Sequence, residues 1–589
     1  MNSAKSVGIF ILMLLMKIYA NVSMGSELFC DHMVLQREKP VRVWGAASDG
    51  EQVTVSVAGQ TKSTTASGGE WEVMLDAMDA GGPYEMTVEG SNTLTFTDVL
   101  VGEVIFGGGQ SNMVVYMVHD ELAGSYAQAA ETADYPEIRI SQHSWYPWEP
   151  SSGSDAYEGY QTLQDRKWHV CTPLNVKAFS AIMYYIGKKV HEEFDVPVGV
   201  ITRGVSAQSL PPFLPALDES QLYERELIEL WRWRIETGLP EGLDVMRDSS
   251  WHTDGKWFDD VKTVLPYTMR TIVWWQGENE MKEYFHYEYR YRYTALISAW
   301  RRIARQGTLP FIAVTEPNGG GWENQPWYCP NTPWEGDTLP YGDVDYPHRT
   351  GMMYETYPLS LDIQDVYMAS AVGLGGGSHP GQKKERAERV KNVMLEKIFG
   401  RNIISEPPLY DSYSIEQGNK MRITYRGNTG DGLYAEGGEV KGFCINSESD
   451  STFVYAQAQI DGADVLVWND NISDPKAVRY GWTGKILECA TLCNSTGLQA
   501  YPFRTDVEPL PTDFTSTAAP ERDYRRDAGF KQGLDGINPA KTAVYDVRGR
   551  LINWKETMPA SLKKNPSGAY IIPYTNNNTG EGYRIIVKQ

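Results

Sequence analysis

Cysteine is scarce in this chain. Its 589 residues carry six, at Cys30, Cys171, Cys329, Cys444, Cys489 and Cys493. The last two are the only closely spaced pair, and no second pair completes the four ligands of a structural zinc site, so we exclude such a site. Disulfides are permitted in an exported chain, but buried thiols fit this scattered spacing equally well.

Positive charge is also in short supply. The chain has 54 Lys and Arg residues against 76 Asp and Glu residues, which gives a formal net charge of -22. A nucleic acid or an anionic membrane would be repelled by this excess, and no basic run offsets it. We therefore expect no nucleic-acid partner, and a neutral or weakly charged substrate fits better.

Long hydrophobic runs are missing as well. The apolar stretch Val7–Met16 covers about ten residues, whereas a helix that crosses a bilayer needs ~20. Lys5 precedes this stretch and small residues follow at Ala20, Ser23 and Gly25, which is the pattern of an export signal. We expect a signal peptide at residues 1–25, a secreted, cell-surface or periplasmic protein, and no membrane insertion.

The composition is otherwise that of a folded protein. Hydrophobic residues make up 41% and charged residues 22%, and the length calls for several domains. From Leu28 to Asp98 short alternating stretches, such as Val53–Val57, are separated by glycine-rich turns. This pattern predicts an N-terminal β-sandwich at residues 26–98.

Strands and helices alternate in residues 99–400. The expected strands are Val104–Phe106, Val196–Ile201, Thr271–Trp275 and Pro310–Thr315, and the expected helices are Phe179–Phe194, Tyr289–Arg305 and Gln382–Phe399. Such alternation predicts an α/β domain with a parallel sheet. Short strands and turns return at 401–508, a Pro-, Ser- and Thr-rich stretch at 509–536 is typical of a linker, and 537–589 reads as a small terminal β module.

One serine stands where a nucleophile is expected. Ser111 follows the strand Val104–Phe106 through three glycines, which allow a sharp turn and leave room for an acyl group. An ordinary glycine-rich turn is the plain alternative. The run Gly109-Gln110-Ser111-Asn112-Met113 is therefore a hypothesis that needs support from the rest of the chain.

That run resembles the first block of the SGNH hydrolases, in their sialate O-acetylesterase branch. Further matches to this branch follow in order over roughly residues 28 to 506: Asp31–Arg37, Val43–Ala46, Ala80–Tyr84, Asp98–Val104, Val196–Ile201, Trp275–Glu278, Ser378–Pro380, Gly497–Leu498 and Pro502–Asp506. The resemblance implies an SGNH-type, flavodoxin-like catalytic domain flanked by small β-rich domains. It also implies a serine esterase that removes O-acetyl groups from carbohydrates without a metal or other cofactor.

The resemblance assigns roles to particular residues. Ser111 is the nucleophile and His379, which stands before Pro380 and a helix, is the general base. The oxyanion donors are the backbone N–H groups of Ser111 and Ser206 and the side chain of Asn279. The branch more often has its polar residue at the position of Glu280, and its glycine-containing second block is here Val205–Gln208. Gln110 and Gln276 complete the expected binding residues.

The carboxylate that orients the base is left open. Many bacterial relatives carry an aspartate three residues before the histidine, where this chain has Gly376. Glu278 of the Gln-Gly-Glu motif and the paired Asp362 and Asp365 are the alternatives. We favour Glu278 over Asp365 and keep both as candidates.

The terminal module has a resemblance of its own. Val544–Arg550, Pro566–Ile572 and Ile585–Lys588 look like the C-terminal sorting domains of Bacteroidetes-type secreted proteins, which implies a bacterial source. For such a protein an acetylated xylan or another plant polysaccharide competes with O-acetylated sialic acid as substrate. A glycan-binding protein that kept the fold without catalysis is the alternative of a different class, and no oligomeric state is predicted.

Overall fold

The computed structural model describes most of the chain. The described residues are 21–118, 123–145, 150, 152–214, 256–280, 289–315, 363–374, 379–416, 419–449, 452–481 and 490–506, with four short strands between 544 and 587. The predicted linker and residues 1–20 of the predicted signal peptide lie outside them. Within the described part, no helix is long and apolar enough to cross a membrane.

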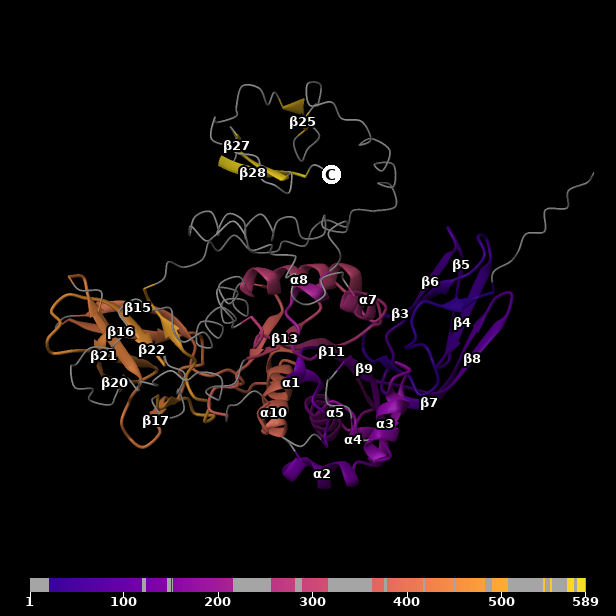
Figure 1. The fold of residues 1–589 in the computed structure, drawn as a ribbon, viewed down its shortest axis with the longest axis horizontal. Coiled ribbons are helices and arrows are strands. Elements are labelled where there is room, and N and C mark those ends of the chain that lie inside the picture. Colours follow the sequence, from indigo (N-terminus) through magenta and orange to yellow (C-terminus); the bar gives the residue numbers. More distant parts are fainter. Residues whose placement is uncertain are drawn as a thin grey trace, which may run out of the picture.

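An N-terminal β-sandwich opens the fold (Figure 1, indigo). One sheet has the order β1 (Ser23–Met24), β3 (Val41–Ala46), β6 (Glu70–Leu75); the facing strands are β5 (Gln60–Thr65), β4 (Gln52–Val57), β7 (Gly81–Glu89), β8 (Thr93–Gly109) and β2 (Val34–Gln36). Burial alternates along β3 and β4, as expected for strands with one face in a core. Val22 is buried and β1 pairs with β3, so the last residues assigned to the signal peptide are part of the sandwich.

Strand β8 joins the sandwich to the central sheet. Its residues alternate between exposed and half-buried as far as Asp98 and are then buried without interruption to Gly109. Its first half pairs antiparallel with β7 and its second half runs parallel to strands of the central sheet. The predicted boundary between residues 98 and 99 therefore falls inside one continuous strand, and the division into domains stays a prediction.

The central sheet has the order β10 (His169–Cys171), β9 (Tyr135–Trp145), β11 (Val198–Val205), β8, β12 (Thr271–Trp275), β13 (Phe311–Val314), β14 (Val366–Ala369). All neighbours from β9 to β14 are parallel, and only β10 is antiparallel. Without β10 and β9, the chain order across the remaining five strands is 2-1-3-4-5, which is the flavodoxin-like order. The predicted α/β fold is confirmed.

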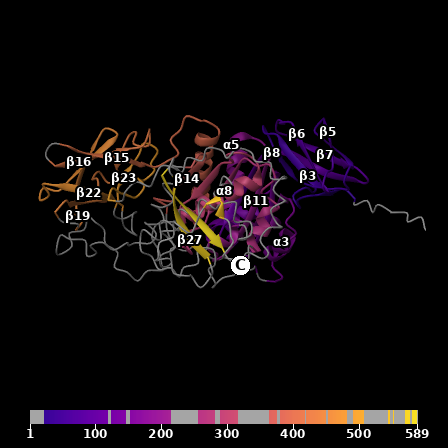
Figure 2. The same cartoon turned by 90° about the horizontal axis from the view of Figure 1, so that it is seen from above.

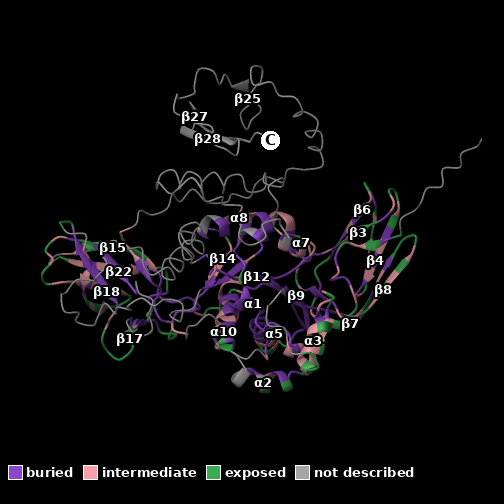
Figure 3. Ribbon diagram, in the orientation of Figure 1, coloured by how far each residue is buried: buried purple, intermediate pink, exposed green. Residues whose placement is uncertain are grey.

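Helices cover both faces of this sheet, as Figures 1 and 2 show. One layer holds α7 (Lys256–Lys262) and α8 (Tyr289–Ala304); the other holds α1 (Ser111–Val114), α2 (Ala123–Glu131), α3 (Asp155–Leu163), α4 (Pro173–Lys177), α5 (Ala181–Phe194) and α10 (Lys383–Val393), which continues into the π-helical turn η4 (Met394–Ile398). The central strands are buried on both sides (Figure 3), which explains their continuous apolar runs.

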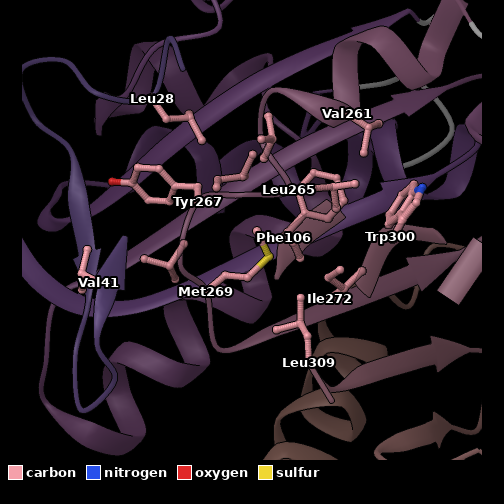
Figure 4. Close-up of a cluster of buried hydrophobic side chains, with 14 of the residues drawn as sticks. Leu28, Val41, Phe106, Val261, Leu265, Tyr267, Met269, Ile272, Trp300 and Leu309 are labelled. Atoms are coloured by element: carbon pink, nitrogen blue, oxygen red, sulfur yellow. The ribbon is translucent and has the colours of Figure 1, made fainter. Parts of the chain in front are cut away.

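The sandwich shares one hydrophobic core with the helix layer that contains α7 and α8. In Figure 4, Leu28 and Val41 of the N-terminal region lie in the same cluster as Phe106 of β8. Beside this core Glu103 is fully buried and accepts hydrogen bonds from Arg37 (2.7 Å) and Arg270 (2.7 Å). Burial alone would raise the pKa of Glu103, but the hydrogen bonds and charge of Arg270 keep it below its usual value. The paired charges fix the sandwich to the start of β12.

A second β-rich unit follows α10 (Figure 1, orange). Its sheets have the orders β15 (Tyr410–Glu416), β16 (Lys420–Tyr425), β21 (Asp464–Trp468), β20 (Gln457–Asp461), then β19 (Val454–Tyr455), β18 (Phe443–Ser447), β22 (Pro475–Tyr480), β24 (Phe503–Arg504), then β17 (Tyr434–Ala435), β23 (Leu492–Cys493). Its core includes Met368 of β14 and Val372. This unit therefore packs against the strand that leads toward His379.

The terminal module contains two strand pairs. β25 (Val544–Tyr545) pairs with β26 (Leu551–Ile552), and β27 (Ala569–Asn576) pairs with β28 (Gly580–Val587), both antiparallel. The resemblance of this module to a sorting domain stays a prediction.

Candidate active site

The nucleophile candidate lies where β8 passes into α1. Gly109 has φ 144°, and a Cβ there would lie 2.0 Å from the carbonyl oxygen of Trp275 on β12. On the other side, a Cβ on Gly204 of β11 would lie 2.8 Å from the carbonyl oxygen of Gly109. Glycine at both positions lets the three strands close together, and the Gln110 N–H then donates to Trp275 O (3.1 Å).

Ser111 is the first residue of the short helix α1 and is 6% exposed. The helix is braced from below, because the Ser180 hydroxyl donates to Met113 O (2.5 Å) and the Ala181 N–H donates to Val115 O (2.9 Å). Ser111 thus stands at the carboxyl end of the parallel strands, which is where ligands bind in open α/β sheets.

Three predicted binding residues meet beside this turn. The side-chain oxygen of Gln110 accepts hydrogen bonds from Gln276 Nε2 (3.2 Å) and from the backbone N–H of Asn279 (3.4 Å). The Gly277 N–H points to the same oxygen at 3.5 Å. The turn after β12 is therefore fastened to the residue that precedes Ser111.

Glu278 lies next to the nucleophile turn. One of its carboxylate oxygens accepts a hydrogen bond from the Asn112 side-chain amide. The other oxygen is buried and has no hydrogen-bond partner among the described residues. A carboxylate that is bonded to the residue after Ser111, and that has one oxygen left over, fits the role of orienting a base.

Asp365 lies at the amino end of the parallel strands, opposite to the end that carries Ser111. It comes just before β14, and the pairing across β13 and β12 sets Val366 level with Phe106 of β8. At about 3.3 Å per residue, Asp365 is on the order of 20 Å below Ser111 along the strands. Its carboxylate accepts from the Tyr367 hydroxyl instead (2.9 Å). The structure therefore removes Asp365 from the site, and Asp362 lies outside the described residues.

The second block, Val205–Gln208, packs against the turn after β12. Ser206 is buried just beyond the end of β11, and Ala207 has φ 57°, in the left-handed region that favours glycine. The turn thus adopts a glycine-like backbone although the glycines of the family are missing. Gln276 Nε2 donates to Gln208 O (3.3 Å), and this hydrogen bond joins the second block to the turn after β12. The role of the Ser206 N–H as an oxyanion donor stays a prediction.

A second carboxyl group is buried behind this turn. Glu280 is 1% exposed and accepts hydrogen bonds from the side chain of Gln276 and the backbone N–H of Leu210. Burial raises its pKa to about 7. The sequence offers Glu280 only as an alternative to Asn279, because nothing in a local motif shows that its side chain turns inward.

The segment that carries His379 is tied to the same edge of the sheet. The Lys383 ammonium donates to the side-chain oxygen of Asn112 (2.6 Å), and the Lys383 backbone N–H donates to the Tyr126 hydroxyl (2.8 Å). The Tyr126 hydroxyl in turn donates to Gly381 O. His379 is four residues before Lys383, a stretch that spans at most ~14 Å. His379 therefore belongs to a segment that is bonded to the residue after Ser111, whereas Gly376 lies outside the described residues.

The start of the histidine loop is supported from three sides. The Arg389 guanidinium of α10 donates to Ser370 O (2.6 Å) and to Val372 O. The Ala371 N–H donates to the Thr315 hydroxyl after β13 (2.7 Å). The Gln499 side chain of the second β-rich unit would lie 3.4 Å from a Cβ on Gly373. The β-rich unit thus helps to place the loop that leads to His379.

Together these residues form the parts of an acyl-transfer site. They supply a serine on a strand-to-helix turn, a carboxylate beside it, amide donors and a histidine on a segment bonded to that turn. Among the described residues, no group of three His, Cys, Asp or Glu is placed to hold a metal ion. Lys383, Arg389 and Tyr126 are among the contributors that the sequence does not single out.

Most of the chain is similar in sequence to known proteins. No family model matches the sequence. The sialate O-acetylesterase of Rattus norvegicus is 24% identical over 568 residues, which cover 86% of this chain and 99% of the relative. The sialate O-acetylesterase of Homo sapiens is 25% identical, with 80% of this chain and 90% of the relative covered.

A solved structure supports the same relationship. The crystal structure of a carbohydrate acetylesterase from Xanthomonas citri is 26% identical, with a TM-score of 0.64. The match covers 83% of this chain and 100% of that protein. Most of this chain therefore shares its fold with a protein of related sequence.

Proposed function

The chain is a homologue of the sialate O-acetylesterases and a carboxylic ester hydrolase, and from this premise we propose that it removes O-acetyl groups from carbohydrates with Ser111 as nucleophile. One arrangement carries the proposal: Ser111 stands on a tight strand-to-helix turn, and the next residue, Asn112, bonds both Glu278 and the lysine four residues after His379. Nucleophile, carboxylate and base segment are joined through a single side chain.

The reaction follows the course of serine esterases. The Ser111 hydroxyl attacks the acetyl carbonyl while His379 takes its proton. The tetrahedral intermediate collapses, the bond to the sugar oxygen breaks, and His379 gives the proton to that oxygen. A water molecule, deprotonated by His379, then attacks the acetyl-enzyme; the bond to the Ser111 oxygen breaks, His379 returns the proton to that oxygen, and acetate is released.

Two groups of residues assist this reaction. Glu278 orients the imidazole of His379 and stabilises its cationic form. The N–H groups of Ser111 and Ser206 and the side-chain amide of Asn279 hold the oxyanion, and each donor contributes on the order of 3 kcal/mol.

The substrate class has two candidates. O-acetylated sialic acid is the substrate in the names of the mammalian relatives. Sialic acid is an anion, so the net charge of -22 favours an acetylated xylan or another plant polysaccharide that lacks acidic sugars.

The protein is further proposed to be a bacterial export product. Because Val22 is buried and Ser23–Met24 pair with β3, the leader would be cut before Val22, and Ala20 offers a small residue at that point. Sequencing the mature N-terminus tests this: Asn21 as the first residue supports it, and retention of Met1 contradicts it. The terminal module would serve as the sorting signal.

The esterase assignment is tested with p-nitrophenyl acetate. Wild-type protein should release p-nitrophenol, and Ser111→Ala should lower the rate at least ~10³-fold. The exposed Ser67→Ala, in the sandwich, is the matched control and should match wild type. Equal rates for Ser111→Ala and wild type would reject the mechanism, and an inactive wild type would favour a glycan-binding protein.

The carbohydrate assignment needs natural substrates. Acetate release should be compared on O-acetylated sialoglycans and on acetylated xylan at equal acetyl content. Release from one of them identifies the substrate class. An enzyme that cleaves p-nitrophenyl acetate but neither glycan would contradict the carbohydrate assignment while leaving the esterase chemistry in place.

A further inference from the structure

A buried lysine lies beside the proposed site. Lys383 is the first residue of α10 and its side chain is fully buried. Its ammonium lies 2.6 Å from Asn112 Oδ1 and 4.1 Å from the ring centre of Trp275. It therefore contacts the residue after the nucleophile and the end of β12.

This placement does not serve helix stability. A buried ammonium loses its hydration, which is costly unless the charge is well paired. The first turn of a helix also carries the positive end of its dipole, which disfavours a cation and favours an acid such as Glu385. Some other gain must offset the burial of Lys383.

The hydrogen bonds of Lys383 continue to a carboxylate. Asn112 Oδ1 accepts from the ammonium, and Asn112 Nδ2 donates to Glu278 Oε1. The opposite orientation of this amide would set donors against the ammonium and an oxygen against the carboxylate. The two charges are thus joined through one amide whose orientation they fix, and in buried surroundings such a chain is mutually strengthening.

The chain of contacts leaves one carboxylate oxygen available. Glu278 Oε1 is occupied by Asn112, whereas Oε2 is buried and without a hydrogen-bond partner among the described residues. His379 lies four residues before Lys383, on the segment that the lysine anchors. The same lysine therefore sets both the carboxylate and the segment of the base.

We propose that Lys383 is a positioning residue for ester hydrolysis: through Asn112 it holds Glu278 with one oxygen directed to His379, and it fixes the His379 segment against the Ser111 turn. This inference rests on the proposed function. Lys383 does not touch the substrate. Its loss should lower kcat, because the base is misplaced, and should leave KM nearly unchanged.

The test uses a matched pair of buried cations on α10. Lys383→Met removes the link to Asn112. Arg386→Met removes a second buried cation that also faces Trp275 (5.5 Å) but whose guanidinium donates to Gln382 O. With p-nitrophenyl acetate, Lys383→Met should lower kcat about 100-fold with KM within about twofold, and Arg386→Met should change kcat less than about threefold.

A double-mutant cycle with Glu278→Gln separates positioning from packing. Because Lys383 acts on Glu278 as well as on the His379 segment, Lys383→Met should cost only about tenfold in the Glu278→Gln background, against about 100-fold in wild type. Multiplicative effects of the two changes would overturn the inference, as would an unchanged kcat in Lys383→Met. An inactive wild type would instead reject the proposed function, so the two failures are distinguishable.

A second variant keeps the inference testable if Lys383→Met does not fold. Asn112→Asp still accepts from Lys383 but no longer donates to Glu278. Its kcat should fall at least about tenfold, with a KM close to that of wild type. Wild-type kcat in this variant would overturn the inference.

Discussion

The two sides of the site are built in different ways. The position of Ser111 is set by backbone contacts. Gly109 and Gly204 let β8, β11 and β12 approach closely, and this packing restricts the path of the turn. The His379 segment is set by side chains, among them Tyr126 of α2 and Lys383 and Arg389 of α10. The nucleophile thus depends on close backbone packing between neighbouring strands, whereas the base depends on side-chain hydrogen bonds between helices and loops.

This difference predicts where the enzyme is most easily broken. A backbone contact cannot relax around an added atom, so a change on the serine side should destroy the fold locally. A side-chain contact can be lost while the strands and helices remain, so a change on the histidine side should cost rate before it costs stability.

The largest effect is expected at the glycine before Ser111. In Gly109→Ala the new Cβ overlaps the Trp275 carbonyl at a φ that alanine avoids, so unfolding free energy should fall by on the order of 3–5 kcal/mol and activity should vanish. Gly381→Ala on the histidine side meets no atom within 4 Å and should stay within about 0.5 kcal/mol of wild type. Urea unfolding measures both, and equal losses would refute the comparison.

Next in size is the carboxylate. Glu278→Gln keeps an acceptor for Asn112 but cannot stabilise an imidazolium, so kcat should fall about 10²–10⁴-fold with little change in melting temperature. Asp365→Asn, at the far edge of the sheet, should leave kcat within about twofold. Steady-state kinetics of the pair decide the matter: a larger loss in Asp365→Asn would return that residue to the site.

The smallest effect is a pH dependence of stability. Burial raises the pKa of Glu280 to about 7, so the folded state holds this proton where the unfolded chain has lost it. The stabilising contribution of the proton is present below the unfolded pKa and is lost as pH rises through 7. Glu280→Gln should therefore gain on wild type between pH 5 and pH 8, by on the order of 1–3 kcal/mol in unfolding free energy. A difference that stays constant with pH would contradict this account.

Much of the fold could be predicted because its elements are locally regular. The expected strand Thr271–Trp275 coincides with β12, and the expected helix from Tyr289 differs from α8 by one residue at its end. The helix expected from Phe179 begins at Ala181, because the Ser180 hydroxyl accepts from the Met183 N–H and caps it.

Strand β9 could not be predicted. Its buried positions include Arg139 and Gln142, which break the apolar run that marks a central strand. Their partners are distant in the sequence, since Arg139 pairs with Asp98 and Gln142 donates to Ala178 O. Only the assembled fold supplies those partners.

The site was predictable to the extent that it is local. Ser111 and the turn of Gln276 and Asn279 follow strands that end at one edge of a parallel sheet. The choice between Glu278 and Asp365 could not be made from the sequence. Glu278 follows β12 and Asp365 precedes β14, and only the strand pairing shows that they lie at opposite ends of the sheet. Lys383 does carry a signal, since helical spacing sets it on one face with Ala387 and Val390, yet a lysine there is ordinarily expected in solvent.

The central claim is that Ser111 carries the acetyl group during turnover, and one measurement tests it directly. Wild-type protein quenched with acid during reaction with excess p-nitrophenyl acetate should gain the mass of one acetyl group, and peptide mapping should locate it on Ser111. Ser111→Ala treated in the same way should remain unmodified. An acetyl group found on another residue, or equal acetylation of Ser111→Ala, would contradict the account.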